Sequence, residues 1–179
     1  MSFETARLVL LACSPQQLVA LIEEPGRFEE LTGFPAADGL REFFVSGDVS
    51  PKWLAALRNT SSPDPWRHGF FVVDRERRCV IGSAGFKGPP DSSGVVEIAY
   101  GIVPSAEGNG YATEAAKALL AFALETADVQ LVRAHTLPVA NASTRVLLKC
   151  GFRHTESVVD PDDGPVWRWE RGRESVGRD

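Results

Sequence analysis

The chain has 179 residues, a length that suits one domain with a sizeable hydrophobic core. Hydrophobic residues make up 44% and charged residues 24% of the sequence, as is ordinary for a soluble globular protein. The formal net charge is -5 and Lys and Arg form no dense cluster, so a nucleic-acid partner is not expected. No apolar run reaches the roughly 18 residues of a membrane helix, so we expect no membrane association.

Cysteine and histidine are scattered along the chain. The cysteines, Cys13, Cys79 and Cys150, are far apart and odd in number, and the three histidines are equally dispersed. Neither a disulfide framework nor a zinc site fits this spacing, so we expect no metal. The N-terminus also lacks the pattern of a signal peptide. These features favour a cytoplasmic protein in a reducing compartment.

The predicted elements begin with a strand over Thr5–Leu11. Ser14 and Pro15 then predict the start of a helix, because serine is a good N-cap and proline suits the first helical position. Residues 25–68 are predicted to hold short helices, one of them around Pro51–Arg58, joined by loops rich in Pro, Gly and Ser.

The middle of the chain predicts an antiparallel meander of three strands, at Gly69–Asp74, Cys79–Phe86 and Val95–Val103. The hydrophobic period then changes at Tyr111–Thr126, whose wide Ala- and Leu-rich face makes it the strongest predicted helix. A strand, a helix and two strands follow, at Val129–Leu137, Asn141–Cys150, Phe152–Val159 and Val166–Glu170. This order implies an α/β (α+β) fold with a mixed, mostly antiparallel sheet flanked by helices. We predict one domain over residues 1–171 and a mobile tail at 172–179.

The loop between Pro104 and the strongest helix is the most informative segment. It contains Gly108-Asn109-Gly110, and glycines let the backbone turn sharply and approach a ligand. The first amides of the following helix lack intrahelical partners, and the helix dipole adds positive potential there. The segment therefore predicts a site for a phosphate or pyrophosphate, to which Thr113 could add a hydroxyl group. On the two glycines alone, a connection without a ligand is favoured, and the loop matches neither a P-loop nor a dinucleotide fingerprint.

Several motifs in the same order resemble the GNAT superfamily of N-acetyltransferases, and within it the RimJ/RimL branch. They are EIAY (97–100), GNGYATEA (108–115), AHTLP (134–138), NASTRVL (141–147) and KCGF (149–152), together with TARLVL at 5–10. The resemblance is strong over residues 79–159 and thin over 25–68. It implies a GNAT-type acyl-CoA fold and an enzyme that uses acetyl-CoA as co-substrate. The acceptor would be an amine, either a small molecule or a protein N-terminus.

The resemblance also assigns residues to the cofactor. The pantetheine arm would lie along the strand Val95–Val103 and bond to the main chain of Ile102 and Val103. The pyrophosphate would rest on main-chain amides, those of Gly108, Asn109, Gly110, Tyr111 and Ala112. The strand Val129–Leu137 would splay away to admit the thioester. Asn141 could bond to the pantetheine or the sulfur, although capping its helix is the favoured role. Glu107 is a departure, because a carboxylate beside a pyrophosphate is unfavourable.

The implied reaction is direct attack of the amine on the thioester. Glu97 is the candidate base, because an apolar setting would raise its pKa toward neutrality; the alternative is a solvated residue that orients a loop. The resemblance implies a residue of the helix at 141–150 that protonates or hydrogen-bonds the departing sulfur, a tyrosine in many GNAT enzymes and commonly a serine in the RimJ/RimL branch. This helix holds no tyrosine, so Ser143 is the candidate; the alternative is capping. A strand amide near Gly101 or Ile102 would stabilise the oxyanion.

Other residues receive structural interpretations. Tyr100 and His135 are interpreted as packed core residues and Cys150 as an inert buried thiol. Trp66 is the tryptophan best suited to line an acceptor pocket. Two alternatives to the enzyme stay open, an acyl-CoA-binding module without turnover and an unrelated phosphate-binding domain. The identity of the acceptor and the choice between monomer and homodimer are also open.

Overall fold

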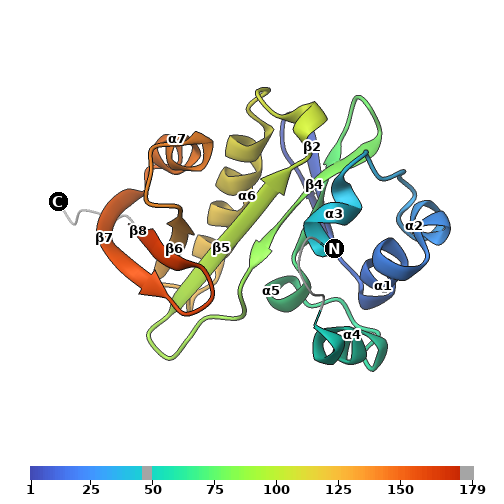
Figure 1. The fold of residues 1–179 in the computed structure, drawn as a ribbon, viewed down its shortest axis with the longest axis horizontal. Coiled ribbons are helices and arrows are strands. Elements are labelled where there is room, and N and C mark those ends of the chain that lie inside the picture. Colours follow the sequence, from blue (N-terminus) through green and yellow to red (C-terminus); the bar gives the residue numbers. More distant parts are fainter. Residues whose placement is uncertain (46–49, 174–179) are drawn as a thin grey trace.

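The computed structural model describes residues 1–45 and 50–173, and its strands form one sheet in the order β1-β2-β3-β4-β5-β6-β8-β7. The strands are β1 Ser2–Glu4, β2 Leu8–Ala12, β3 Phe70–Asp74, β4 Cys79–Phe86, β5 Val95–Ile102, β6 Leu131–Thr136, β7 Arg153–Asp160 and β8 Gly164–Gly172. Neighbouring strands are antiparallel except β5 and β6, which are parallel. The predicted mixed, mostly antiparallel sheet is therefore confirmed (Figure 1).

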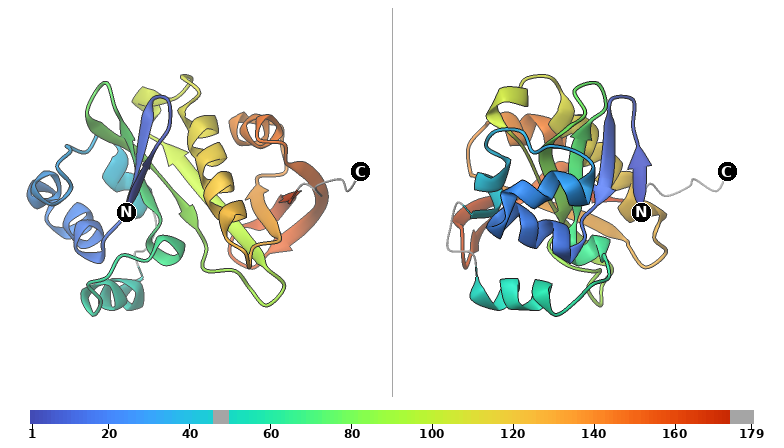
Figure 2. Two further views of the ribbon diagram at one scale, coloured as in Figure 1. Left: turned by 180° about the vertical axis from the view of Figure 1, so that it is seen from behind. Right: turned by 90° about the vertical axis from the view of Figure 1, so that its right-hand side faces the viewer.

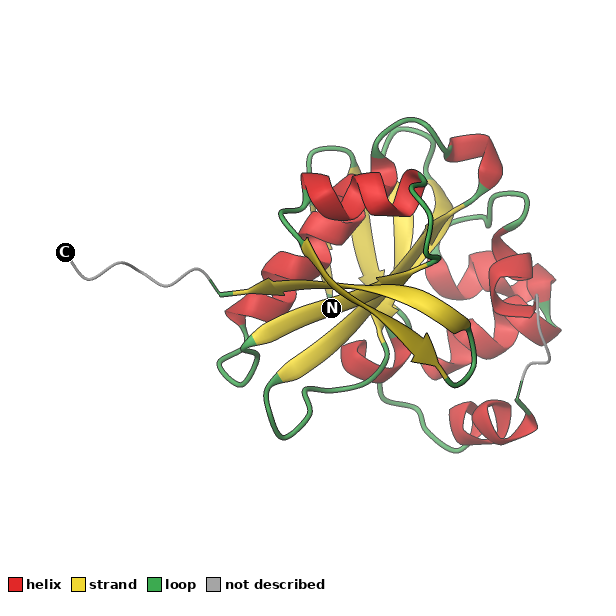
Figure 3. Cartoon of the chain, turned by 60° about the vertical axis from the view of Figure 1, so that its left-hand side comes forward, coloured by secondary structure: helices red, strands yellow, loops and turns green. Residues whose placement is uncertain are grey.

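Helices flank this sheet on both sides, as predicted (Figure 3). They are α1 Pro15–Glu23, α2 Pro25–Thr32, α3 Leu40–Val45, α4 Pro51–Arg58, α5 Pro65–His68, α6 Tyr111–Glu125 and α7 Ala142–Lys149, with a 3₁₀ turn at Pro104–Ala106. Figure 2 shows α6 lying across the face of the sheet that is seen from behind, while α1 to α3 lie toward the opposite face. No helix in the described ranges is long and apolar enough to cross a membrane.

Strand β3 shows how the core is divided between the two faces, because consecutive strand residues point to opposite sides. Phe70 packs edge-on against Phe122 of α6, with ring centroids 5.5 Å apart. Its neighbour Phe71 packs against Phe28 of α2 at 5.2 Å. Both β3 side chains are fully buried, so the sheet has an α6 face and a second face toward α1 to α3.

The predicted first strand, Thr5–Leu11, is wrong in its bounds. The chain forms a hairpin of β1 and β2 instead, with its turn at Thr5. The Thr5 main chain donates to the Leu8 carbonyl (2.9 Å), and the Leu8 amide donates to the Thr5 hydroxyl (3.0 Å). Such local side-chain bonds compete with extended structure, which explains why the pattern of β2 does not continue through the turn.

The predicted starts of α1, α4 and α6 agree with the structure. Ser14 and Gln17 form a reciprocal capping box at the start of α1. The predicted helix Pro51–Arg58 matches α4, and the predicted helix Tyr111–Thr126 ends one residue earlier, at Glu125.

The C-terminal strand extends further than predicted. β8 continues to Gly172, and Arg173 donates from Nε to the Val129 carbonyl at 2.7 Å. These two residues, expected in the mobile tail, are therefore held by the fold. The rest of the expected tail, 174–179, lies outside the described residues.

Candidate acyl-CoA site

The gap between β5 and β6 defines the centre of the site. The two strands pair only at Val95–Glu97 with Leu131–Arg133, so they part beyond this point as predicted. The Val103 amide donates to Ile81 of β4 at 2.8 Å. By the alternation of an antiparallel ladder, the Gly101 amide also points to β4 and the Ile102 amide points to the gap. The edge of β5 from Ile98 onward is therefore open on the β6 side.

The loop before α6 presents a row of free amides beside this gap. Within the described residues, the amides of 108–113 donate to no protein group, and the first bond into α6 runs from Glu114 to the Gly110 carbonyl (3.1 Å). Gly108 and Gly110 have φ of 76° and 80°, in the left-handed region that favours glycine. The free amides and the helix dipole together place positive potential at this loop, as the predicted anion site requires.

A cavity of about 560 Å³ joins the loop, the end of β5 and one side of α7. Seven of the residues predicted for the site line it, namely Ile102, Gly108, Gly110, Tyr111, Ala112, Thr113 and Ser143. Val103 does not, because its side chain is fully buried and its amide is already bonded to β4. The Val103 carbonyl also accepts from the Ala106 amide at 2.9 Å, so the main-chain groups expected to bond to pantetheine at Val103 are already paired within the protein.

Two predicted site residues, Asn109 and Asn141, do not line this cavity. The Asn109 side chain donates to the carbonyls of Ala106 and Glu107, both at 3.0 Å, which stabilises the loop from within. Asn141 forms a capping box with Thr144, accepting from the Thr144 amide at 3.0 Å. The favoured capping role of Asn141 is confirmed.

Two cationic side chains that were not predicted from the sequence line the cavity. Arg145 and Lys149 lie one helical turn apart on α7 and face the loop across the cavity. Glu107 lines the same cavity from the loop, where the sequence predicted an unfavourable carboxylate. The i, i+4 spacing of Arg145 and Lys149 beside the predicted loop was the available signal.

Glu97 lies at a second cavity, of about 360 Å³, which shares Tyr100 and Ser143 with the first. The predicted apolar setting of Glu97 is wrong. Its Oε1 accepts from Lys87 Nζ (2.6 Å) and from His135 Nδ1 (3.0 Å). Burial opposes the charged form, but these bonds outweigh it and lower the pKa of Glu97 instead of raising it. Oε2 has no partner among the described residues.

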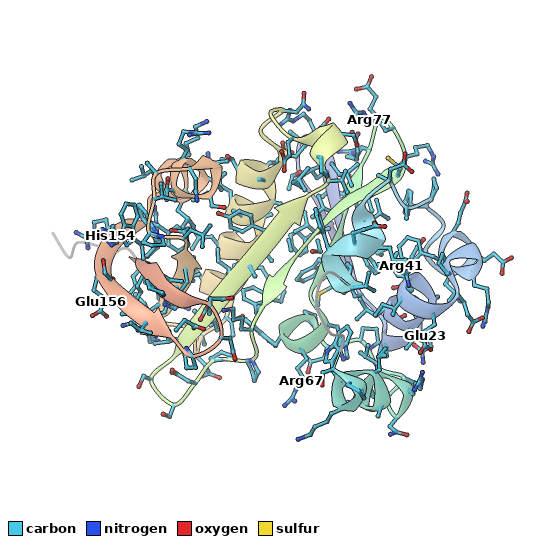
Figure 4. All side chains as sticks on the ribbon, viewed as in Figure 1. Glu23, Arg41, Arg67, Arg77, His154 and Glu156 are labelled. Atoms are coloured by element: carbon cyan, nitrogen blue, oxygen red, sulfur yellow. The ribbon has the colours of Figure 1, made fainter. Side chains whose placement is uncertain are left out.

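His135 is not the packed core residue that the sequence suggested. It lines the second cavity, and its Nε2 faces Arg168 Nε at 3.4 Å. Arginine can only donate, so Nε2 accepts and Nδ1 carries the proton that is donated to Glu97. Arg168 also pairs with Glu156, labelled on β7 in Figure 4. A row of polar side chains thus crosses this face of the sheet and fixes one oxygen of Glu97.

Ser143 and Tyr100 stand where the two cavities meet. Ser143 is exposed in the first turn of α7, and its hydroxyl has no hydrogen-bond partner in the described part of the chain. Tyr100 packs partly into the core, as expected, and also lines both cavities. Burial raises the pKa of Tyr100, so its hydroxyl stays protonated and available as a donor.

A third cavity, of about 420 Å³, lies on the face of β5 opposite α6. Its floor consists of small residues from β4 and β5, Ser83, Gly85, Ala99 and Gly101. Phe43 of α3 lines both this cavity and the first, and 38% of it is exposed. The Phe43 side chain is therefore accessible from both cavities.

Trp66, predicted to line an acceptor pocket, belongs to the core instead. Its ring packs against Phe86 at 4.5 Å and Phe122 at 5.3 Å between centroids. Cys150 is buried, as predicted, and burial raises the pKa of its thiol. Among the described residues, no group of three or more His, Cys, Asp or Glu side chains could hold a metal ion.

A mixed sheet that parts between its two parallel strands, beside an unpaired helix start, defines an acyl-CoA-dependent transferase fold. The family model for the acetyltransferase (GNAT) domain matches residues 33–153, more than half of the chain. The chain therefore belongs to the GNAT acetyltransferase family and is an acyltransferase enzyme. This favours turnover over the alternative of a binding module.

Three known proteins illustrate the similarity. The uncharacterized N-acetyltransferase YjdG of Bacillus subtilis (strain 168) is 28% identical over 149 residues, which cover 83% of each chain. A ribosomal-protein alanine acetyltransferase from Vibrio fischeri has a similar fold, with a TM-score of 0.65, 13% identity and 97% of each chain covered. The ribosomal α-N-protein acetyltransferase RimL, solved in complex with coenzyme A, gives a TM-score of 0.66 at 14% identity over 96% of this chain and 98% of that one.

Proposed function

We propose that this enzyme transfers the acetyl group of acetyl-CoA to a primary amine, on a small molecule or a protein N-terminus. The observation that carries the proposal is the run of unpaired amides at 108–113, which opens on a cavity that reaches the unpaired edge of β5. One end of that cavity suits a diphosphate, and the other end suits an extended arm that pairs with a strand.

The residues present fit the cofactor. The amides of Gly108, Gly110 and Ala112 would hold the pyrophosphate, with the Thr113 hydroxyl nearby. Arg145 and Lys149 would supply the positive charge that the loop itself lacks, and Glu107 would oppose it. The pantetheine would donate to the Ile102 carbonyl on the gap side of β5, which leaves the Ile102 amide for the thioester. Acetyl-CoA supplies an activated acyl group that needs no metal.

Three groups of this chain would serve the transfer. The Ile102 amide points into the gap and would donate to the oxygen of the thioester as negative charge develops on it. Ser143 would donate to the sulfur as the carbon–sulfur bond breaks. Glu97 would receive the proton that leaves the attacking amine, through Oε2 and directly or by way of one water molecule.

The environment of Glu97 supports a specific charge state for its carboxylate and leaves one of its two oxygens for the substrate. Its lowered pKa keeps the carboxylate ionised at neutral pH, which suits the binding of an ammonium group before its proton departs. Lys87 and His135 hold Oε1, so only Oε2 is left to meet the acceptor. His135 is not itself a base in this arrangement, because Arg168 occupies its Nε2.

The third cavity would hold the body of the acceptor. It touches Ala99 and Gly101, and Ala99 also lines the cavity that contains Glu97. His68 accepts the Asp64 amide at Nδ1 (3.0 Å), so its Nε2 carries a proton at the rim of the third cavity. The exposed Phe43 ring and the His68 donor favour an amine substrate that has an apolar body and an atom that can accept a hydrogen bond.

Acetyl transfer is tested by release of free thiol from acetyl-CoA with a panel of amines and N-terminal peptides. We expect turnover with at least one member, and thermal stabilisation of the protein by CoA alone. Glu97→Gln and Ser143→Ala should each lower kcat by about tenfold or more and leave the Kd for CoA within about twofold. If neither variant loses activity, the roles assigned to these residues are wrong. If CoA does not stabilise the wild-type protein, the cofactor site is wrong.

A further inference from the structure

The N-terminal hairpin contacts the cofactor loop from behind. Arg7, in the turn between β1 and β2, donates from Nη1 to the Asn109 carbonyl at 2.8 Å. Its guanidinium carbon also lies 4.7 Å from the centre of the Tyr111 ring, in a cation–π contact. A β-carbon at Gly110 would lie 3.4 Å from Arg7 Nη2. Arg7 does not line the cavity, so these contacts hold the side of the loop that faces away from the cofactor.

The same hairpin holds the carboxylate of Glu114, in the first turn of α6. Glu114 Oε2 accepts from Arg7 Nε (2.8 Å), and Oε1 accepts from the Arg7 amide (2.8 Å) and the Thr5 hydroxyl (2.6 Å). Burial opposes the charged form, but these bonds outweigh it and lower the pKa of Glu114. The carboxylate is therefore ionised and fully occupied.

This arrangement removes a competitor from the anion site. An ionised side chain in the first turn of a helix is attracted to the free amides at its N-terminus. A released Glu114 would compete with the pyrophosphate for those amides, and its charge would repel the ligand. The Arg7 guanidinium neutralises this charge and holds Oε2, while the Arg7 main-chain amide and the Thr5 hydroxyl hold Oε1.

A second contact fixes the same helix start independently of Arg7. The Tyr111 hydroxyl donates to Asp74 Oδ2 at 3.0 Å, and the buried Asp74 also pairs with Arg77, which Figure 4 labels at the β3–β4 turn. Removal of Arg7 should therefore change the loop and its charge without unfolding α6.

We propose that Arg7 is a positioning residue for the cofactor, which keeps Glu114 and the Asn109 carbonyl on the back of the loop so that the amides at 108–113 stay open to a diphosphate. This inference rests on the proposed function. It also makes residues before position 33, where the family match begins, part of the cofactor site.

The test is the Kd of the full chain for CoA, measured by calorimetry. We expect Arg7→Ala to raise this Kd by at least about tenfold, and to raise KM for acetyl-CoA while kcat at saturation stays within about threefold. The matched control is Arg75→Ala. Arg75 supports the same hairpin through the Thr5 carbonyl (3.0 Å) and Glu4 but does not touch the loop. Its Kd should stay within about twofold of the wild type.

A double variant isolates the role of the charge. Arg7→Ala combined with Glu114→Gln should recover at least about threefold of the lost affinity, because no carboxylate without its neutralising cation then repels the diphosphate. If Arg7→Ala does not fold, Arg7→Lys replaces it; lysine lacks the planar fork and should weaken CoA binding by about threefold or more.

Three results would overturn the inference: an unchanged Kd in Arg7→Ala, an equal loss in Arg75→Ala, or no recovery in the double variant. Failure of the wild-type protein to bind CoA is a different result, because it would reject the proposed cofactor site itself.

Discussion

Arg168 donates to Nε2 of His135 across 3.4 Å, and this contact sets the tautomer in which His135 donates its other proton to Glu97. The two residues face each other in the register of β6 and β8. A histidine that could have served as a base is thereby converted into a fixed hydrogen-bond donor.

The pH dependence of turnover should report this contact. In His135→Ala, Glu97 loses one of the two donors that lower its pKa, so that pKa rises. Because the ionised carboxylate receives the proton, the acid limb of kcat/KM should move to higher pH. Arg133→Gln is the control, since Arg133 lies on the same face of β6 but pairs with Glu170 at 2.7 Å. An acid limb that stays in place would contradict the role of His135.

The same carboxylate should affect folding stability. The pKa of Glu97 is lower in the folded protein than in the unfolded chain. Its ionisation therefore contributes stability that is fully present above the unfolded pKa and is lost as the pH falls through the folded pKa. Glu97→Gln should lose less stability on acidification than the wild type, as measured by urea midpoints over a pH series. Parallel midpoint curves for the two proteins would rule out this contribution.

Charge around the first cavity should set the affinity for CoA. Glu107→Gln removes the carboxylate that opposes the pyrophosphate and should tighten binding by about twofold to fivefold. Arg145→Gln and Lys149→Gln should weaken it by similar factors, and all three effects should shrink at high salt. Glu125→Gln, at the far end of α6, is the control for a general charge effect. Calorimetric titrations at two ionic strengths measure these changes in Kd. An electrostatic effect shrinks at high salt, whereas a loss of folded protein does not.

Variants of Asn141 can separate a role in capping α7 from a direct contact with the cofactor. Asn141→Ala should lower stability by about 1 kcal/mol, because the capping bond to the Thr144 amide is lost. Asn141→Ser should retain most of that stability, since serine also caps. If Asn141 acts only as a cap, Asn141→Ser binds CoA like the wild type. A weakened Kd in this variant, with stability retained, would instead show a direct contact with the cofactor.

Phe43 should affect the acceptor more than the cofactor. Phe43→Ala removes the exposed ring between the first and third cavities, so KM for an apolar amine should rise by about tenfold or more. KM for a small polar amine should change much less. Leu31→Ala is the control, because Leu31 is similarly exposed, at 39%, but lies on α2 away from these cavities. Equal losses for polar and apolar amines would refute an apolar acceptor site.

The sequence predicted those parts of the site whose signals are local. The loop at Gly108 to Gly110 has its own turn residues and the helix after it has its own apolar face, and both were found where expected. The parting of β5 and β6 followed from the family resemblance and is confirmed by their three-residue register.

The setting of Glu97 could not be read in the same way, because it depends on contacts between distant residues. Its partner His135 is 38 positions away in the sequence, and Arg168 a further 33 positions beyond His135. Because Glu97 lies between Val, Ile and Ala in the sequence, its environment was expected to be apolar. In the folded chain, Lys87 and His135 instead place hydrogen-bond donors beside it. Residues 25–68 were difficult for a related reason, since α2, α3 and α5 are only eight, six and four residues long.

The unpaired edge of β5 has a consequence for the protein without its cofactor. From Ile98 to Ile102 the outward amides have no strand to bond with, so they should exchange quickly with solvent deuterium. An extended ligand in the gap would complete the sheet and slow that exchange. The cofactor would then act as a temporary ninth strand. Without it, the enzyme would be prone to pairing with other chains along the unpaired edge of β5.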